Sequence, residues 1–280
     1  MKIHFTKMQG AGNDYVYINA LQYPIEHPEK AAIRLSDRHF GIGSDGLVLI
    51  MPSDTCDFRM RMFNADGSEA QMCGNASRCI GKYVYEKGLT DKTQFTLETL
   101  SGVKHLSLTV QDKTVKEIEV DMGKPVLTPA EIPVLLPEVD EVIDYPFNIS
   151  GFPLHLNCVS MGNPHAIFFV HDLSEIDVHG LGRIVEHHPI FPERTNVEFA
   201  QVLSREEIRM RVWERGSGET MACGTGACAT VVAAIKNGFC NPKVLVHLPG
   251  GDLHIRWDQE SGSVLLSGPA EIVFEGEMEL

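Results

Sequence analysis

A chain of 280 residues is long for a single hydrophobic core and has room for two domains of about 100 to 150 residues each. Its content of 43% hydrophobic, 22% charged and 8% aromatic residues is that of a globular protein and argues against a disordered or fibrous one. Because 24 basic and 38 acidic residues give a net charge of −14, without a run of Lys or Arg, we expect no nucleic-acid partner and no membrane-surface partner.

The N-terminal segment and the cysteines favour a cytoplasmic protein. The segment MKIHFTKMQG lacks the apolar stretch of about 7 to 15 residues that a signal peptide needs, and no stretch of about 18 apolar residues follows. The 7 cysteines do not form the framework of a small secreted domain, so we expect them to be reduced. Their closest pairs lack the usual zinc spacings, and no metal site is predicted.

The first half of the chain predicts strands around one helix. An early strand and loops lead to a strand near FRMRMF (58–63), and a helix begins after Cys73. Gly88 is placed to end this helix. Two strands then alternate polar and apolar residues, VKHLSLTV (103–110) and VKEIEV (115–120), as half-buried strands do. The apolar stripe of the helix consists of Ala76, Cys79, Ile80, Tyr83 and Val84.

A break in this pattern marks a domain boundary. Gly123 and Pro125 interrupt the strands, so we place the boundary near residue 120. The segment after Gly268 exceeds what the second half needs, and we expect it to return to the sheet of the first domain. The predicted domains are residues 1–120 together with 268–280, and residues 121–267.

The second half repeats this order of elements. A strand near IRMRVW (208–213) precedes a helix that begins after Cys223, and Gly238 is placed to end it. This helix is small and apolar nearly all round, so we expect its sheet to wrap around it. The strands that follow are KVLVHL (243–248), LHIRW (253–257) and VLLS (264–267).

A fixed offset of 150 positions relates the two halves. Cys223 minus Cys73 is 150, and the same shift relates Gly74 to Gly224. Further pairs at this offset are Asn13 with Asn163, Phe63 with Trp213, Asn64 with Glu214, Glu69 with Glu219 and Gly88 with Gly238. We therefore predict an α+β fold of two domains related by a pseudo-twofold axis, each a largely antiparallel sheet wrapped around a central helix.

The matched cysteines suggest acid–base chemistry. Such an axis could bring Cys73 and Cys223 face to face across a cleft, each at a helix start, where the free N–H groups and the helix dipole favour an anion. We therefore expect lowered pKa values for both thiols. Two helix ends could also hold the α-carboxylate of an amino acid. One thiolate would take the α-proton and the opposite thiol would supply a proton to the other face, which inverts the carbon.

Five further cysteines have no partner at the offset of 150, and we interpret them as packing residues. They are Cys56, Cys79, Cys158, Cys228 and Cys240.

Several segments resemble the diaminopimelate epimerase family. NADGSEAQMCGN (64–75) and ERGSGETMACGTGACA (214–229) are similar to its two cysteine motifs, and GAGNDYV, SMGNPHA and RTNVEF resemble its other substrate-contacting segments in the family's order. The resemblance covers nearly the whole chain. It implies an isomerase of lysine, amino-acid and peptidoglycan-precursor biosynthesis that interconverts LL- and meso-diaminopimelate. It also implies a homodimer that works without pyridoxal phosphate or a metal.

The resemblance also implies the site residues. Cys73 and Cys223 would be the two acid/base thiols, and His165 would support them. The helix ends that bind the reacting carboxylate would be Gly74, Asn75, Gly224 and Thr225. The distal amino-acid head needs an Arg fork for its carboxylate and oxygen acceptors for its ammonium group. The residues implied there are Asn13, Asn64, Asn163, Asn196, Glu214 and Arg215.

Some of these residues also have plain structural interpretations. Asn13 could be a turn residue, Glu214 and Arg215 a solvated pair, and His165 a satisfied structural histidine. Three positions depart from the family pattern. Ala76 and Ser77 stand where many members have a glycine and an alanine, and Gly46 stands where some have a glutamine, so we expect no side-chain contact from Gly46.

Three other functions compete with this interpretation. A proline racemase or hydroxyproline epimerase is similar in fold, but it typically has a histidine after its first Cys-Gly, where this chain has Asn75. A thiol redox protein would form a reversible disulfide between Cys73 and Cys223, and an amino-acid-binding module would leave the α-hydrogen of its ligand in place. No cofactor is predicted, because CGTGACA lacks the Lys of a phosphate loop and GIGSDG lacks the setting of a dinucleotide site.

Overall fold

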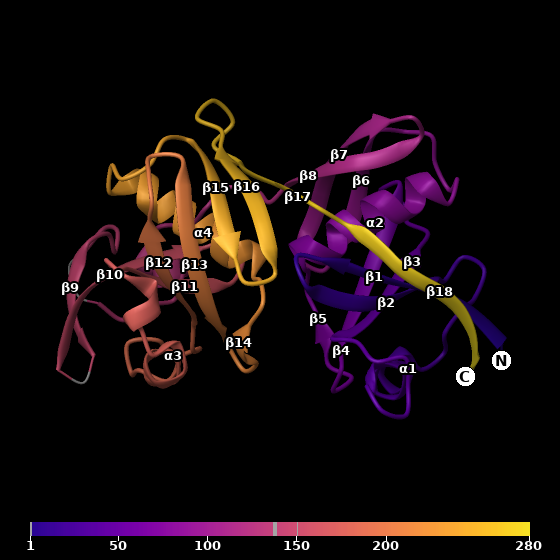
Figure 1. The fold of residues 1–280 in the computed structure, drawn as a ribbon, viewed down its shortest axis with the longest axis horizontal. Coiled ribbons are helices and arrows are strands. Elements are labelled where there is room, and N and C mark those ends of the chain that lie inside the picture. The colour runs from indigo at the N-terminus through magenta and orange to yellow at the C-terminus, as the bar shows by residue number, and fades with distance from the viewer. Residues whose placement is uncertain (1, 137–138, 150) are drawn as a thin grey trace. The chain divides into compact units, whose positions relative to one another are not determined.

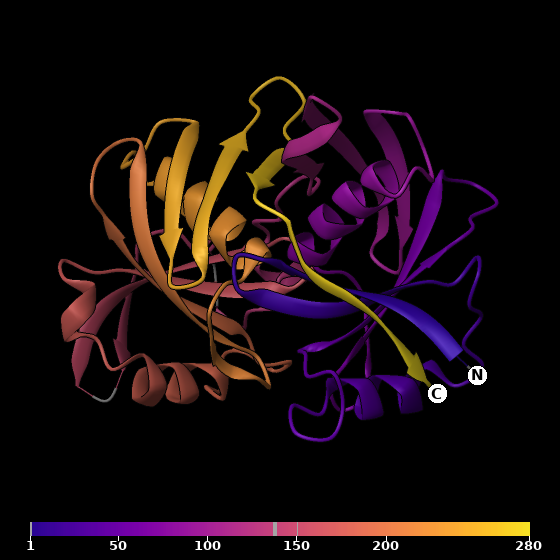
Figure 2. The same cartoon turned by 45° about the vertical axis from the view of Figure 1, so that its right-hand side comes forward.

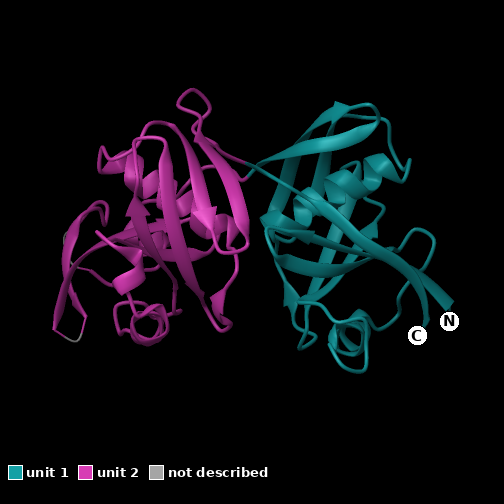
Figure 3. Ribbon diagram, viewed as in Figure 1, with its two compact units in different colours: residues 1–121, 267–280 teal, residues 122–266 magenta. Residues whose placement is uncertain are grey.

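The computed structural model describes residues 2–136, 139–149 and 151–280. The chain divides into two compact units, Met1–Asp121 with Ser267–Leu280 (unit 1) and Met122–Leu266 (unit 2), which are coloured separately in Figure 3. Among the described residues, no helix has both the length and the apolar character to cross a membrane.

Unit 1 consists of strands around a long helix (Figure 1). Its helices are α1 (Pro28–Ser36) and α2 (Gly74–Glu86). Its strands are β1 (Lys2–Gly10), β2 (Asn13–Asn19), β3 (Gly46–Met51), β4 (Phe58–Asn64), β5 (Glu69–Ala70), β6 (Gln94–Thr99), β7 (Gly102–Gln111), β8 (Thr114–Asp121) and β18 (Glu271–Glu279). The strands expected at 58–63, 103–110 and 115–120 are therefore confirmed as β4, β7 and β8.

The sheet of unit 1 is largely antiparallel. β1 pairs antiparallel with both β2 and β18, while β2 with β3 and β4 with β6 are parallel pairs. The pairs β3–β4, β6–β7 and β7–β8 are antiparallel. The register of β18 on β1 runs from Lys2 opposite Glu279 to Gln9 opposite Glu271, so the last segment returns to this sheet as the sequence predicts.

Unit 2 repeats the elements of unit 1 in the same order, except that its counterpart of β18, strand β9 (Tyr145–Ile149), comes first. Its helices are α3 (Val178–Glu186) and α4 (Gly224–Lys236), with short 3-10 turns η1 (Pro129–Glu131) and η2 (Leu173–Glu175). Its strands are β9 (Tyr145–Ile149), β10 (Phe152–Ser160), β11 (Pro164–Phe169), β12 (Asn196–Val202), β13 (Glu207–Glu214), β14 (Gly218–Thr220), β15 (Lys243–Leu248), β16 (Gly251–Trp257) and β17 (Val264–Gly268), whose last residues belong to unit 1. The predicted second-half strands are confirmed as β13, β15, β16 and β17.

The offset of 150 reappears in the pairing of the strands. β9 pairs antiparallel with β10 as β18 does with β1, and β11–β12 is a parallel pair like β2–β3. Helix α4 begins and ends 150 positions after α2, and α3 lies 150 positions after α1. Even a surface ion pair is repeated, because Arg61–Glu69 and Arg211–Glu219 each join an Nε to an Oε1 at 2.7 Å.

Two helices were not expected from the sequence. The segments before β3 and β12 are predicted as loops, but they contain α1 and α3. Both are short, and each buries a narrow face that includes Leu35 in α1 and Val185 in α3. Nine-residue helices gain most of their stability from tertiary packing, which local sequence signals report poorly.

Helices α2 and α4 are each enclosed by the strands of their own unit (Figures 1 and 2). Helix α4 is buried along most of its length, as its apolar sequence predicts. The stripe predicted on α2 is buried too, but Ser77 and Arg78 outside the stripe are also buried, so the amphipathic interpretation of α2 was too narrow. Gly88 and Gly238 follow the helix ends with φ of 68° and 74°, a conformation that favours glycine.

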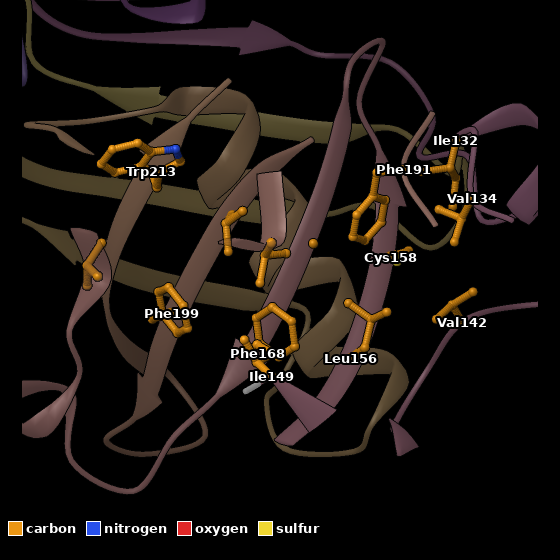
Figure 4. Packing of buried hydrophobic residues seen from close by; sticks show 14 of the residues in the cluster. Ile132, Val134, Val142, Ile149, Leu156, Cys158, Phe168, Phe191, Phe199 and Trp213 are labelled. Carbon is orange, nitrogen blue, oxygen red and sulfur yellow. The ribbon is translucent and has the colours of Figure 1, made fainter. Parts of the chain in front are cut away.

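The core of unit 2 lies on one face of β11 and β12 (Figure 4). Phe168 and Phe199 stack there with ring centroids 5.6 Å apart, and Leu156 and Cys158 of β10 belong to the same cluster. Because strand side chains alternate, His165 on β11 and Glu198 on β12 point to the opposite face. The apolar core therefore fixes two strands that present polar groups toward α4.

Candidate active site

Cys73 is the N-cap residue of α2, as its position in the sequence predicts. Its side chain is half-buried, and its thiol donates a hydrogen bond to Asn13 Oδ1 at 3.4 Å. Asn13 Nδ2 in turn donates to Asp45 Oδ2 at 2.8 Å. Asn13 is therefore held between the thiol and a carboxylate, and is more than a turn residue.

A group of four charged residues lies behind Asn13, and sequence reasoning did not find it. Arg38 Nη2 lies 2.9 Å from Asp14 Oδ1 and 3.0 Å from Asp45 Oδ1, and the buried Lys7 Nζ lies 2.5 Å from Asp14 Oδ2. Burial opposes ionisation of Asp14, but hydrogen bonds from Arg38 and Lys7 lower its pKa overall. Burial and the neighbouring Asp14 charge raise the pKa of Asp45. This group fixes the partner of Asn13.

The other predicted residues of unit 1 take different positions. Gly74 is the first residue of α2 and is buried. Asn75 follows it with 2% of its surface exposed, and its Oδ1 accepts no hydrogen bond from any residue that the structure describes. Asn64 ends β4, and its Nδ2 donates to Ser68 Oγ at 3.0 Å. A buried acceptor such as Asn75 Oδ1 is costly unless a ligand or water satisfies it.

Cys223 is the N-cap residue of α4, with 6% of its surface exposed. Its Sγ accepts a hydrogen bond from the Gly226 N–H at 3.4 Å and lies 3.4 Å from Thr225 Oγ1. Gly224 begins the helix and is buried, while Thr225 is half-buried. A backbone N–H and a hydroxyl group of the first helical turn therefore both contact this sulfur atom.

The expectation of a lowered thiol pKa is wrong for Cys223. Burial raises the pKa of this thiol well above its ordinary value, and the carboxylates of Glu214 and Glu198 raise it further. The hydrogen bonds from Thr225 and Gly226 act in the opposite direction but do not compensate. The helix N-terminus lowers the pKa of a thiol, but burial has a larger effect here, because a thiolate would lose its hydration and face two acidic groups. Cys223 is therefore a protonated thiol in this state.

His165 connects three other polar residues of unit 2. It is fully buried, and its Nδ1 lies 2.7 Å from Oε1 of the equally buried Glu198. Its Nε2 lies 3.1 Å from Asn163 Oδ1, and Asn163 Nδ2 donates to Thr225 Oγ1 at 3.3 Å. A chain of contacts therefore leads from a buried carboxyl group through His165 to the neighbour of Cys223.

Asn196, Glu214 and Arg215 surround the end of β13. Asn196 is buried, donates from Nδ2 to Pro164 O at 2.8 Å and accepts at Oδ1 from the Arg215 N–H at 3.0 Å. Glu214 accepts a hydrogen bond from the Thr220 hydroxyl, and burial raises its pKa. Arg215 is exposed, with Nη1 3.0 Å from Glu193 O. Glu214 interacts with the Cys223 thiol, while the Arg215 guanidinium reaches away to a loop.

The predicted site residues thus fall into two groups, one in each unit. Unit 1 holds Asn13, Asn64, Cys73, Gly74 and Asn75, and unit 2 holds Asn163, His165, Asn196, Glu214, Arg215, Cys223, Gly224 and Thr225. Glu198 and Asp45 were missed. Glu198 had a usable signal, because it is a charged residue inside the apolar run VEFA, at the offset of 150 from Val48.

A shallow pocket of about 390 Å³ lies elsewhere in unit 2, beside α3. Its lining includes Arg183, Glu186, Arg194 and Trp213, and it includes none of the predicted site residues. The Glu186 carboxylate is already occupied there by the Trp213 Nε1–H at 2.7 Å and the Gly216 N–H at 2.9 Å. Across residues 2–136, 139–149 and 151–280, no cluster of three or more His, Cys, Asp or Glu side chains is placed to hold a metal ion.

The remaining cysteines include Cys79, which is fully buried in α2 and whose pKa burial raises from 9.0 to about 11. The unfolded thiol ionises first, so the stability that it contributes is complete below about pH 9 and is lost as the pH rises toward 11. We expect urea unfolding between about pH 8 and pH 10.5 to show a smaller loss of stability for Cys79→Ala than for the wild type, by about 2 kcal/mol. Parallel losses in the two proteins would contradict this. Cys158 and Cys228 are equally buried, whereas Cys56 is half-buried.

The duplicated fold places the chain in a known structural class. It is similar to a hydroxyproline epimerase from Agrobacterium vitis, with a TM-score of 0.71 and 13% identity over 99% of this chain and 91% of that one. A phenazine biosynthesis protein of the PhzF family from Bacillus anthracis gives a TM-score of 0.70 with 18% identity, and each chain is fully covered. At this level of identity the likeness shows a shared fold.

Sequence comparison gives the family. Residues 5–128 and 157–273 match the diaminopimelate epimerase family. A diaminopimelate epimerase of Phocaeicola vulgatus is 56% identical over 279 residues, and one of Acetivibrio thermocellus is 53% identical over 280 residues, with 99% of each chain covered in both cases. The chain belongs to the diaminopimelate epimerase family.

Proposed function

We propose that this protein interconverts LL-2,6-diaminopimelate and meso-diaminopimelate, using Cys73 and Cys223 as an acid/base pair. The observation that carries this proposal is the duplication of one arrangement in a chain of this family. Each unit places a cysteine as the N-cap residue of a buried helix, 150 positions apart. Asn13 contacts Cys73, and Asn163, at the same offset, contacts Thr225, which lies next to Cys223. The proposed place of the reaction is lysine and peptidoglycan-precursor biosynthesis.

The two thiols have different surroundings, and this suggests how they share the work. Cys223 holds its proton because it is buried beside Glu214 and Glu198, so we assign it the role of proton donor in the state described here. Cys73 is half-buried next to the amide of Asn13, and its thiolate form would act as the base for the same direction of reaction. In the reverse direction the roles exchange, as microscopic reversibility requires.

The helix starts would stabilise the charge that develops on the substrate. Removal of an α-proton moves negative charge onto the α-carboxylate, and backbone N–H groups at Gly74, Asn75, Gly224 and Thr225 are free of intrahelical partners at these positions. Donors that are already in place stabilise such charge without reorganisation. Thiols and backbone groups would therefore supply the chemistry of the proton transfers.

The distal head of diaminopimelate would be held by the polar side chains that the family resemblance implies. Arg215 supplies a guanidinium for its carboxylate, and Glu214 and Asn196 lie beside Arg215. Asn13, Asn64 and Asn163 supply amide oxygens for the ammonium group. The cytoplasmic homodimer implied by the family resemblance belongs to this proposal as well.

A comparison of substrates tests the proposal. The purified protein should convert LL-diaminopimelate to the meso form, as followed by chiral chromatography, and should leave L-proline unchanged, because proline has no second head for Arg215 to bind. Turnover of proline without turnover of diaminopimelate would favour the racemase alternative. If the reduced protein inverts neither amino acid, the proposal is wrong, and a thiol redox protein or an amino-acid-binding module becomes the better interpretation.

A further inference from the structure

The hydrogen-bond chain of unit 2 has a direction, and that direction matters for Cys223. Asn163 can donate to Thr225 with Nδ2 and accept from His165 with Oδ1, or it can flip and do the reverse. In the first arrangement the Thr225 hydroxyl accepts from Asn163, so its own proton is available to Cys223 Sγ at 3.4 Å. In the flipped arrangement Thr225 donates to Asn163, and only its lone pairs face the sulfur. Only the first arrangement stabilises a thiolate.

The His165 ring selects between these arrangements. If Nε2 carries a proton it donates to Asn163 Oδ1 at 3.1 Å, which fixes the first arrangement. Nε2 must carry a proton whenever Nδ1 accepts a hydrogen bond in the neutral ring, and also whenever the ring is charged. The Glu198 contact of 2.7 Å at Nδ1 therefore controls the far end of the chain.

Glu198 can fill this role when the Glu198–His165 pair holds a proton between the two side chains, on either partner, with Nε2 also protonated. Burial raises its pKa although His165 opposes the effect, and its Oε2 accepts no hydrogen bond within the part of the chain that the structure describes. A carboxylic acid that donates from Oε1 to Nδ1 suits such surroundings better than a bare carboxylate. A charged pair, with the proton on Nδ1, would leave Nε2 protonated as well. Both placements of this proton give the same direction to the chain, whereas a pair that has lost the proton, with a neutral ring donating from Nδ1 to the carboxylate, would reverse it.

We propose that Glu198 is a positioning residue for Cys223: through His165, Asn163 and Thr225 it keeps a hydroxyl proton directed at the sulfur atom. The role is to stabilise the Cys223 thiolate at the moment it must form. The inference rests on the proposed function to the extent that Cys223 has to alternate between thiol and thiolate.

The repeat supports this assignment, because unit 1 has neither the carboxyl group nor the glycine that packs against it. At the offset of 150, Val48 stands in place of Glu198 and Ala76 in place of Gly226. A Cβ atom added at Gly226 would lie 2.5 Å from Glu198 Oε1, so the glutamate needs glycine opposite it. Unit 1, with valine at the matching strand position, has alanine. The second glycine of the motif CGTG is thus explained by the carboxyl group that packs against it.

Other ionisable groups also face Cys223, and they define what a test must separate. Glu214 of β13 and Glu198 of β12 both raise the pKa of the thiol, while His165 of β11 lies behind Glu198. If Glu198 acted only as a negative charge, removing it would make the Cys223 thiolate easier to form. If it acts through the chain, removing it makes the thiolate harder to form. The two roles have opposite signs.

The experiment measures the alkylation rate of each cysteine by iodoacetamide over a range of pH, without substrate, using peptide mass spectrometry. The main variant is Glu198→Val with Gly226→Ala, which copies the packing of Val48 and Ala76 in unit 1. We expect Cys223 to react about tenfold more slowly in this variant, the effect of losing a hydrogen bond to an anion. Glu198→Gln should stay within about threefold of the wild type, because its amide N–H can also donate to His165 Nδ1.

A second pair of variants tests the last link and does not alter the buried strand. Thr225→Val should slow Cys223 about as much as the double variant, and Thr225→Ser, which keeps the hydroxyl, should not. The rate of Cys73 should be unchanged in all four proteins, and continued protection of Cys79 and Cys158 reports that the fold is intact. If the double variant unfolds, the two Thr225 variants and Glu198→Gln still test whether the hydrogen-bond chain stabilises the Cys223 thiolate.

Several results would overturn the proposal. Faster labelling of Cys223 in the double variant or in Glu198→Gln would show that the carboxyl group acts only as a repelling charge. Equal slowing in Thr225→Val and Thr225→Ser would show that the hydroxyl is not involved. Because the assay needs no substrate, a protein that fails to invert diaminopimelate but gives the expected labelling would defeat the proposed function and leave this inference standing.

Discussion

Replacement of Cys73 or Cys223 by alanine is expected to lower the rate of diaminopimelate inversion by about 10² to 10⁴-fold, the usual contribution of one general acid or base. In the proposed mechanism, each substitution removes the group that exchanges a proton with one face of the α-carbon. A water molecule at the N-terminus of the helix would be a poor substitute for the thiol as an acid or base. The measurement is the initial rate in both directions with each purified variant.

A matched control is available in the same helix. Cys79 lies six positions after Cys73 in α2, is fully buried, and has its pKa raised by burial to about 11, so Cys79→Ala should retain most of the activity. Normal turnover by Cys73→Ala or by Cys223→Ala would contradict the two-thiol scheme. A loss of activity in Cys79→Ala that matches the other two would indicate that folding, and not proton transfer, is being measured.

Gly226→Ala is expected to have the second largest effect. The new Cβ would lie 2.5 Å from Glu198 Oε1, and the glutamate cannot move aside easily because it is fully buried and bonded to His165. Overpacking of this kind costs about 1 to 3 kcal/mol of stability. It would also displace the Gly226 N–H and Cys223, and misplacement by about 1 Å can cost about 10²-fold in rate. Urea unfolding and initial rates measure the two effects.

The opposite change in the other unit is the control. Ala76→Gly creates no clash and should lower the free energy of unfolding by about 0.5 to 1 kcal/mol, the usual effect of replacing alanine by glycine in a helix. Adding Glu198→Val to Gly226→Ala should restore the lost stability, because the pair then matches Val48 and Ala76. If Gly226→Ala is as stable and as active as the wild type, Glu198 does not pack closely against Gly226 of α4.

The repeat made much of the fold predictable. Strong periodicity gave the strands at β7, β8, β15 and β16, and Gly88 and Gly238 ended their helices because both adopt a positive φ. Helices α1 and α3 were missed, since a short helix with a narrow buried face carries a weak local signal. The burial of Arg78 on α2 was missed as well, because a stripe on one helix does not show that strands surround it.

The sequence suggested candidate site residues, but it did not predict the electrostatic surroundings that the structure gives them. The position of Cys223 at a helix start argued for a lowered pKa, yet burial and the carboxylates of Glu214 and Glu198 raise it. Those neighbours come from β12 and β13, and no spacing around Cys223 reveals that they face it. Asp45 was missed for the same reason, because its contact with Asn13 joins a loop to a strand 32 positions earlier.

The central claim is that two groups act on opposite faces of one carbon. It is tested most directly by running the reaction of LL-diaminopimelate in heavy water and measuring deuterium at the α-carbon before much product has formed. We expect meso product that carries solvent deuterium at the inverted carbon, while the unreacted substrate keeps its hydrogen, because the donor is not the group that took the proton. Product that retains the hydrogen of the substrate would mean that a single group removes and returns it, and would contradict the account.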